Sequence, residues 1–203
     1  MSVEISETRA GAASAVRTGV SISAVREESR FAALFGDVRL LLIALWLGAA
    51  LFSLVVAQGA FSVLPTRELA GAVVGHALAF LNTSGFAISV LLFISSFFMP
   101  AKTTNRARLT ERIALLIVAL ATAIEQWVIT ARLRDIRAAM GRPVDELAKD
   151  DPLRVAFGSL HGYSIIVLML AMLAAAIAFF AIARRSKAVQ SPKSNVQSQD
   201  VAA

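Results

Sequence analysis

The chain has 203 residues, a formal net charge of +6 and no cysteine; 57% of its residues are hydrophobic and 17% are charged. Soluble domains average about 45–50% apolar and about 25% charged residues, so this composition excludes an ordinary water-soluble globule. The absence of cysteine excludes a disulfide scaffold, cysteine-ligated zinc, iron–sulfur clusters and thiol catalysis.

The first 29 residues form a polar segment with both charge signs and no apolar run of signal-peptide length. We predict a disordered tail over residues 1–29. Immediately after it, apolar residues repeat at helical spacing, at Phe31, Leu34, Phe35 and Val38. This stripe fits two structures equally well: an amphipathic helix lying in the membrane surface, or the frayed start of the first membrane span.

Four long apolar blocks follow, and only the third contains an acidic residue, Glu125. Crossing a hydrocarbon core of about 30 Å takes about 20 helical residues, so each block is long enough to span a membrane. We predict spans at about residues 39–61, 69–100, 111–133 and 157–184. The predicted fold is an all-α, integral membrane four-helix bundle over residues 30–185, with the interfacial N-terminal helix as an open alternative. A second disordered tail is predicted over residues 186–203.

The second span contains two features that bear on helix packing. Gly71 and Gly75 form a GxxxG motif, and Ala79 extends the ridge of small residues. Such a ridge favours close helix packing, either within one subunit or between two copies. The cluster Asn82-Thr83-Ser84-Gly85 is a site where this long helix can bend; without a bend, the helix protrudes beyond the bilayer.

The placement of the basic residues predicts the orientation. They flank the spans before the first, between the second and third and after the fourth, as at Arg39, Arg112 and Arg184, whereas the first loop has only Arg67. The positive-inside rule therefore places both termini in the cytoplasm, in a plasma or inner membrane, although the mixed charges of the third loop weaken the assignment. The basic residues are expected to contact anionic headgroups of the lipid bilayer. No basic–aromatic interleaving indicates nucleic acid.

One layer near the predicted outer ends of the spans collects polar side chains from all four helices. Its members are Gln58, His76, Glu125, Gln126, His161 and Ser164. Three interpretations remain open. The layer is a structural hydrogen-bonded cluster; or it binds a metal through His76, Glu125 and His161, or a haem between the two histidines; or Glu125 and His161 relay protons or line a substrate path.

The order of several short motifs resembles the transmembrane-protein-205-like family. They are Trp46-Leu47-Gly48, Phe52, Phe61, Leu64-Pro65, Ala70-Gly71, Ala121-Thr122, Trp127, Asp151-Pro152, Phe157 and His161-Gly162-Tyr163-Ser164. The chain departs from that family at Ile129-Thr130, where a proline is expected, and at Leu168, where an asparagine is expected. The resemblance implies a small four-helix membrane protein whose activity is unassigned. Helix number and inward histidines are also similar to copper-resistance-D-like membrane proteins, an analogy of architecture only.

The predicted function follows from the architecture and from the motifs that are missing. The sequence has no HExxH, GxSxG, P-loop or glycine-rich dinucleotide motif, so we predict that the protein is not an enzyme. We expect a structural or interaction component of a membrane, with a second copy or a membrane complex as partner and no cofactor. The alternative is a metal- or haem-binding membrane protein, with copper or haem, or a small transporter component.

Overall fold

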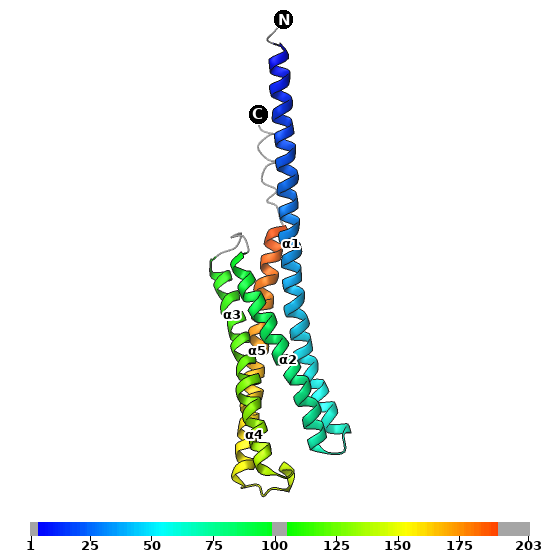
Figure 1. The fold of residues 1–203 in the computed structure, drawn as a ribbon, viewed down its shortest axis with the longest axis vertical. Helices are drawn as coiled ribbons and strands as arrows, with labels where there is room; N and C mark the ends of the chain where they lie inside the picture. Colours follow the sequence, from blue (N-terminus) through cyan, green and yellow to red (C-terminus); the bar gives the residue numbers. More distant parts are fainter. Residues whose placement is uncertain (1–3, 99–104, 191–203) are drawn as a thin grey trace, which may run out of the picture.

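A computed structural model describes the backbone of residues 4–98 and 105–190, and most side chains between Glu27 and Arg184. This part of the chain consists of helices and short connections, without strands (Figure 1). Five α-helices follow one another: α1 (Glu4–Val63), α2 (Arg67–Phe98), α3 (Asn105–Ala123), α4 (Thr130–Met140) and α5 (Pro152–Gln190). A π-helix, η1 (Ile124–Ile129), joins α3 to α4, and a short 3₁₀-helix, η2 (Val144–Glu146), precedes α5.

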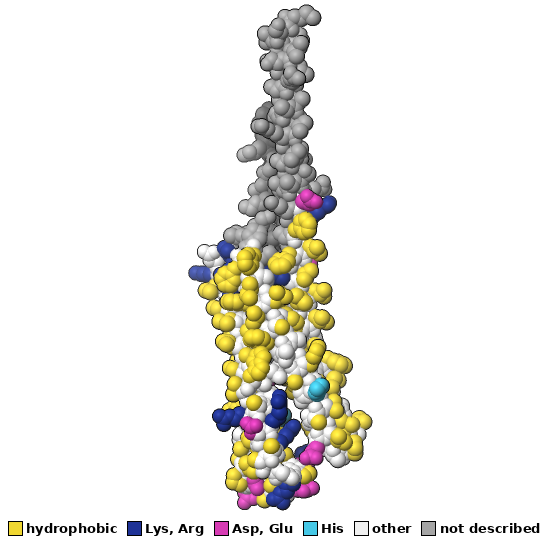
Figure 2. Space-filling model, viewed as in Figure 1, with side chains coloured by type: hydrophobic (Ala, Val, Ile, Leu, Met, Phe, Trp, Pro, Cys, Tyr) yellow, Lys and Arg dark blue, Asp and Glu magenta, His cyan; other side chains and the backbone are white. Residues whose placement is uncertain are grey.

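Four helical segments are long and apolar enough to cross a membrane: Ala33–Val63, Arg67–Phe98, Asn105–Met140 and Pro152–Arg184. The third of them combines α3, η1 and α4. Large apolar side chains cover the outside of the bundle (Figure 2), among them Leu45, Phe80 and Leu173, each more than three-fifths exposed. A surface of this kind suits lipid and not water. The prediction of an all-α, four-helix, multi-pass membrane protein is therefore confirmed.

At both ends of the chain, helix extends beyond the predicted spans. α1 begins at Glu4, so most of the segment predicted as a disordered tail continues the first span as one helix. Residues 4–38 contain no proline and many good helix formers, which explains the continuity. In Figure 1 this part of α1 runs along the axis of the span, as the start of a span does and an interfacial helix does not. α5 extends to Gln190, and the rest of the predicted C-terminal tail lies outside the described residues.

Small side chains let the helices approach one another closely. α3 packs against both α2 and α5, and α1 packs against α2 and α5. On α5, Ala171, Ala174, Ala175 and Ala178 are buried against the core. Alanine at these positions lets the neighbouring backbones come close, which is the usual basis of helix association in membranes.

A glycine on α2 makes room for a tryptophan side chain of α1. A Cβ atom at Gly85 would lie 2.4 Å from Nε1 of Trp46, so only glycine accommodates this indole. The same Nε1 donates a hydrogen bond to the carbonyl of Leu81 at 2.9 Å. The cluster predicted as a bend thus lies inside the continuous helix α2 and provides the notch for Trp46. We call α1 and α2 the first limb, and α3 to α5 with η1 the second limb.

The two limbs are packed together at one end of the bundle and diverge at the other (Figure 1). We call the end near Arg39, Phe98, Asn105 and Arg184 the closed end, and the opposite end, beyond Val63 and Met140, the split end. Figure 2 shows the surface hollowed between the limbs toward the split end. The largest fully buried side chains all lie between the closed end and the level of Glu125: Arg39, Ile43, Ser89, Leu92, Ser96, Glu111, Leu115, Val118, Thr122 and Ile182.

The GxxxG ridge lies in the first limb, toward the split end. A Cβ atom at Gly75 would meet nothing within 4 Å, and one at Gly71 would meet only Nη2 of Arg137, at 3.4 Å. Within the described part of the chain, the ridge therefore does not pack closely against another helix.

Candidate functional site

Glu125 lies in the π-helix of the third span. Its backbone carbonyl accepts hydrogen bonds from the N–H of Thr130 and, at 2.8 Å, from the hydroxyl of Thr130. The hydroxyl thus stabilises the wider turn. π-Helical turns are rare and occur often at functional sites, because the extra residue changes where side chains point.

The carboxyl group of Glu125 is buried and only half of it has a partner. The residue is 5% exposed, and its Oε1 accepts a hydrogen bond from the hydroxyl of Ser164 on α5 at 2.5 Å. Its Oε2 is buried without a hydrogen-bond partner among the described residues, and so is Oε1 of the neighbouring Gln126. Both of these atoms are acceptors. The site therefore has an unmet need for hydrogen-bond donors.

His161 adds a second ionisable group beside the carboxyl group. It lies one helical turn before Ser164 on α5, the residue whose hydroxyl bonds to Glu125. Its imidazole stacks on the ring of Phe157, with ring centroids 6.3 Å apart, and is exposed. On α5, an exposed titratable group thus lies one turn from the hydroxyl that bonds the buried carboxyl group of η1.

The predicted polar layer is thus only partly assembled. Glu125, Ser164 and His161 come together, whereas Gln58 and His76 are exposed on the diverging first limb. No three His, Cys, Asp or Glu side chains in the described part are grouped so that they could hold a metal ion. The proposed ligand set of His76, Glu125 and His161 does not fit a metal in this arrangement, because His76 and the other two lie on different limbs.

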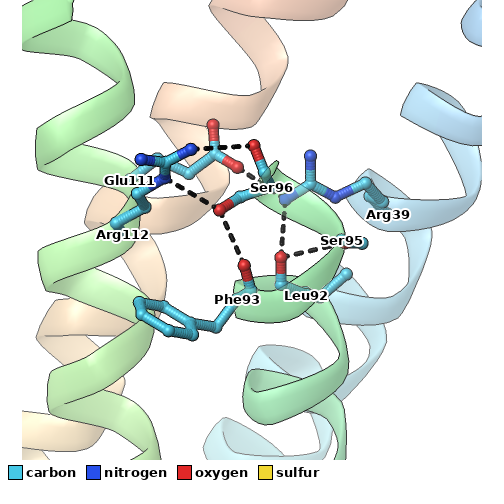
Figure 3. A network of polar contacts seen from close by, with 7 residues as sticks. All are labelled: Arg39, Leu92, Phe93, Ser95, Ser96, Glu111 and Arg112. Carbon is cyan, nitrogen blue, oxygen red and sulfur yellow. Dashed lines mark hydrogen bonds and ion pairs between the residues drawn. The ribbon is translucent and has the colours of Figure 1, made fainter. Parts of the chain in front are cut away.

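A second polar site, absent from the predicted layer, lies at the closed end (Figure 3). Nη2 of Arg39 on α1 lies 2.5 Å from Oε1 of Glu111 on α3, and the two side chains are 2% and 1% exposed. The same Nη2 donates to the carbonyl of Leu92 on α2 at 2.9 Å. One guanidinium therefore joins three helices in a nearly dry environment.

The neighbouring Arg112 joins α3 directly to α2. Its Nε donates to the hydroxyl of Ser96 at 3.1 Å, and its Nη2 donates to the carbonyl of Ser96 at 3.2 Å. The guanidinium also lies 3.9 Å from the centre of the Phe97 ring, a cation–π contact. We call Arg39, Glu111, Arg112 and Ser96 the closed-end network. Its bonds from Arg39 to Glu111 and from Arg112 to Ser96 both join the first limb to the second.

One family model matches the sequence over residues 41–142, which is half of the chain. It is described as a domain of unknown function, DUF4149. The chain belongs to this family. The DUF4149 region includes Glu111 and Glu125 and ends before Ser164 on α5. No curated protein and no solved structure matches the chain.

The charge pattern does not predict the closed-end network of this DUF4149 protein, because Arg39 and Arg112 also fit the basic flanks of membrane spans. Helical spacing carries a signal for it. Arg39 continues the buried stripe of Ile43, Trp46 and Ala50 by one turn. Glu111 begins a stripe of its own, and the members of this second stripe are Glu111, Leu115, Val118, Thr122 and Glu125. Residues at these intervals share one face of a helix, so the two acids of the third span face the core on the same side.

Proposed function

We propose that this protein is a non-enzymatic membrane protein, a small transporter component that takes up and releases a proton at Glu125. The observation that carries the proposal is the buried carboxyl group on a π-helix, bonded to a hydroxyl on one oxygen and open to a donor on the other. An ionisable group inside a membrane span is costly to keep and is usually functional. Both termini are proposed to be cytoplasmic, which the basic flanks of the spans support.

His161 supplies the route by which the proton is proposed to reach the carboxyl group. An imidazolium at the exposed position can give its proton to the carboxylate of Glu125 and return to neutral imidazole. The hydroxyl of Ser164 holds Oε1 in place during the exchange. The open acceptor Oε2 is the atom to which the proton would be added.

Infrared difference spectroscopy tests the proposal. Wild-type protein in lipid nanodiscs is expected to gain a carboxyl C=O band on acidification that is missing in Glu125→Gln. Glu68→Gln, an exposed acid at the start of α2, is the matched control and should keep the band. Identical difference spectra for wild type and Glu125→Gln would contradict the proposal.

A structural or interaction role is the second candidate, and the open GxxxG ridge favours it. No described residue covers Gly75, so the ridge at this position is available to a helix of a second copy or of a membrane complex. Gly75→Leu is expected to remove self-association measured by energy transfer between labelled copies in vesicles. Unchanged energy transfer would exclude this ridge as the interface. The resemblance to the transmembrane-protein-205-like family is compatible with either function.

The proposal includes no cofactor. A proton on Oε2 or a water molecule can satisfy the open acceptors at Glu125 and Gln126, and no three His, Cys, Asp or Glu side chains among the described residues are grouped so that they could hold a metal ion. Purified protein is therefore expected to be colourless and free of stoichiometric metal. A Soret band or one bound copper per chain would revive the haem or metal interpretation of His76 and His161.

A further inference from the structure

We propose that the closed-end network is a gate, which seals the Glu125 site from one side of the membrane while the split end leaves it open to the other. This inference rests on the proposed function, because a gate has a role only if Glu125 exchanges something with both sides. The structure then represents one of two states. In the other state, the limbs would separate at the closed end and meet at the split end.

At the closed end, the polar side chains described between the network and Glu125, Ser89 and Thr122, are buried and bond to carbonyls of their own helices. Fully buried apolar side chains from all four spans fill the space between the network and Glu125, and they are Ile43, Leu92, Leu115, Val118 and Ile182. Such a packed apolar layer excludes water. Arg39 and Glu111 close the bundle beyond this layer, at 2% and 1% exposure.

The split end is held far less firmly. Figure 2 shows the hollow between the limbs there, and Gly75 on the first limb faces open space. An ion pair between Arg67 and Asp145 spans the limbs, but it measures 3.5 Å and its side chains are 78% and 53% exposed. Exposed pairs of this length add little to stability. His161 is exposed on this half of α5, and this is the side from which we propose that the Glu125 site is reached.

The bonds of the closed-end network lie where a gate needs them. The bonds from Arg39 to Glu111 and from Arg112 to Ser96 both cross between the limbs, so separating the limbs breaks them together. Within the first limb, Trp46 remains bonded to α2 and keeps α1 and α2 together as one body. Movement of one body against another around a central site is the usual way in which small transporters alternate access.

The polar chemistry of this end also favours a gate over a permanent clamp. Replacing a buried ion pair by well-packed apolar side chains is often neutral or stabilising. An ion pair is therefore not needed to hold helices together. Its distinctive property is that both partners regain hydration when they separate, so the open state is accessible. Apolar side chains would be exposed to water instead.

Cysteine labelling tests the gate, because the chain has no cysteine of its own. Ser89→Cys is the reporter: Ser89 is fully buried in α2 between Glu125 and the network, and its hydroxyl donates to the carbonyl of Phe86 in its own helix. Ser62→Cys, exposed at the split end, establishes the sidedness of the vesicles. A membrane-impermeant thiol reagent is then added from either side of oriented vesicles.

The reporter is placed in three backgrounds: the otherwise wild-type protein, Glu111→Gln, and a double variant of Arg39 and Glu111. Glu111→Gln, which weakens the ion pair, is expected to raise labelling from the closed-end side about tenfold, as for a shift between two populated states. The double variant Arg39→Met with Glu111→Leu packs the end with apolar groups and is expected to abolish that labelling. Both variants are expected to keep the infrared band of Glu125.

Each result has a defined meaning. Equal labelling in all three backgrounds overturns the gate, and so does a rise from both sides at once, which indicates a loosened bundle. The double variant keeps the test valid even if Glu111→Gln fails to fold, because its expected loss of labelling is measured against wild type. If the Glu125 band is absent from wild type, the proposed function fails. If the band is present and labelling never changes with the network, only the gate fails.

Discussion

Two ion pairs lie at opposite ends of this bundle and differ in every physical respect. Arg39 and Glu111 meet at 2.5 Å in a nearly dry core, whereas Arg67 and Asp145 meet at 3.5 Å in the open. The first is surrounded by the largest buried side chains of the protein, and the second lies beside a hollow. The contrast shows that packing, and not the presence of charges, decides how firmly each end is held.

The largest effect is expected when the buried pair loses one partner. Arg39→Ala removes the guanidinium that bonds to the buried carboxylate of Glu111 and should lower the free energy of unfolding by about 3–5 kcal/mol. Denaturation in mixed micelles, followed by circular dichroism, measures the change. Arg30→Ala is the control, because Arg30 lies earlier on α1 and is exposed. Equal losses for the two variants would remove the distinction between buried and exposed charge at this end.

Alanine substitutions at two glycines of α2 test how tightly the two halves of this helix are packed. Gly85→Ala places a methyl group against the indole of Trp46 and should lower the free energy of unfolding by about 1–3 kcal/mol. Gly75→Ala, toward the split end, meets nothing and should stabilise α2 by at most about 1 kcal/mol. The same denaturation assay measures both. A loss at Gly75 as large as that at Gly85 would show that the split end is packed in solution.

Removing the partner of Ser164 should have a smaller effect. Glu125→Leu deletes the acceptor and leaves the hydroxyl of Ser164 buried without it, which should lower the free energy of unfolding by about 1–2 kcal/mol. Glu125→Gln keeps an amide oxygen at the same position and should remain close to wild type. Unfolding curves of the two variants and wild type in one detergent decide the matter. Three superimposed curves would argue against a buried hydrogen bond.

The sequence predicts well how deep each residue lies and poorly which way it points. Counting along each apolar block places the four spans, and it places Glu125 and Ser164 at matching depths, where they bond. The same counting places His76 beside them. It fails there because depth does not show that the first limb diverges from the second. That divergence depends on the tilt of whole helices, which no local pattern encodes.

At the closed-end network, the sequence predicts which way a residue faces but not which residue it contacts. Arg39 and Arg112 obey the flanking pattern of membrane helices, which hides their contacts with the core. Helical phase identifies Glu111 as inward-facing, because it shares a face with Leu115 and Val118. Its partner on α1 is 72 residues away in the chain, and only the packed structure shows the pairing.

The smallest effect is expected at the split end. Arg67→Ala removes an exposed partner at 3.5 Å and should change the free energy of unfolding by about 0–0.5 kcal/mol, because water and salt already screen the pair. A double-mutant cycle with Asp145→Ala isolates the interaction and should give a coupling energy near zero. The same cycle on Arg39 and Glu111 should give a coupling energy several times larger, since neither group is hydrated in the folded state. If the two cycles gave equal coupling energies, burial would not be what distinguishes the ends, and the closed end would be no better sealed than the split one.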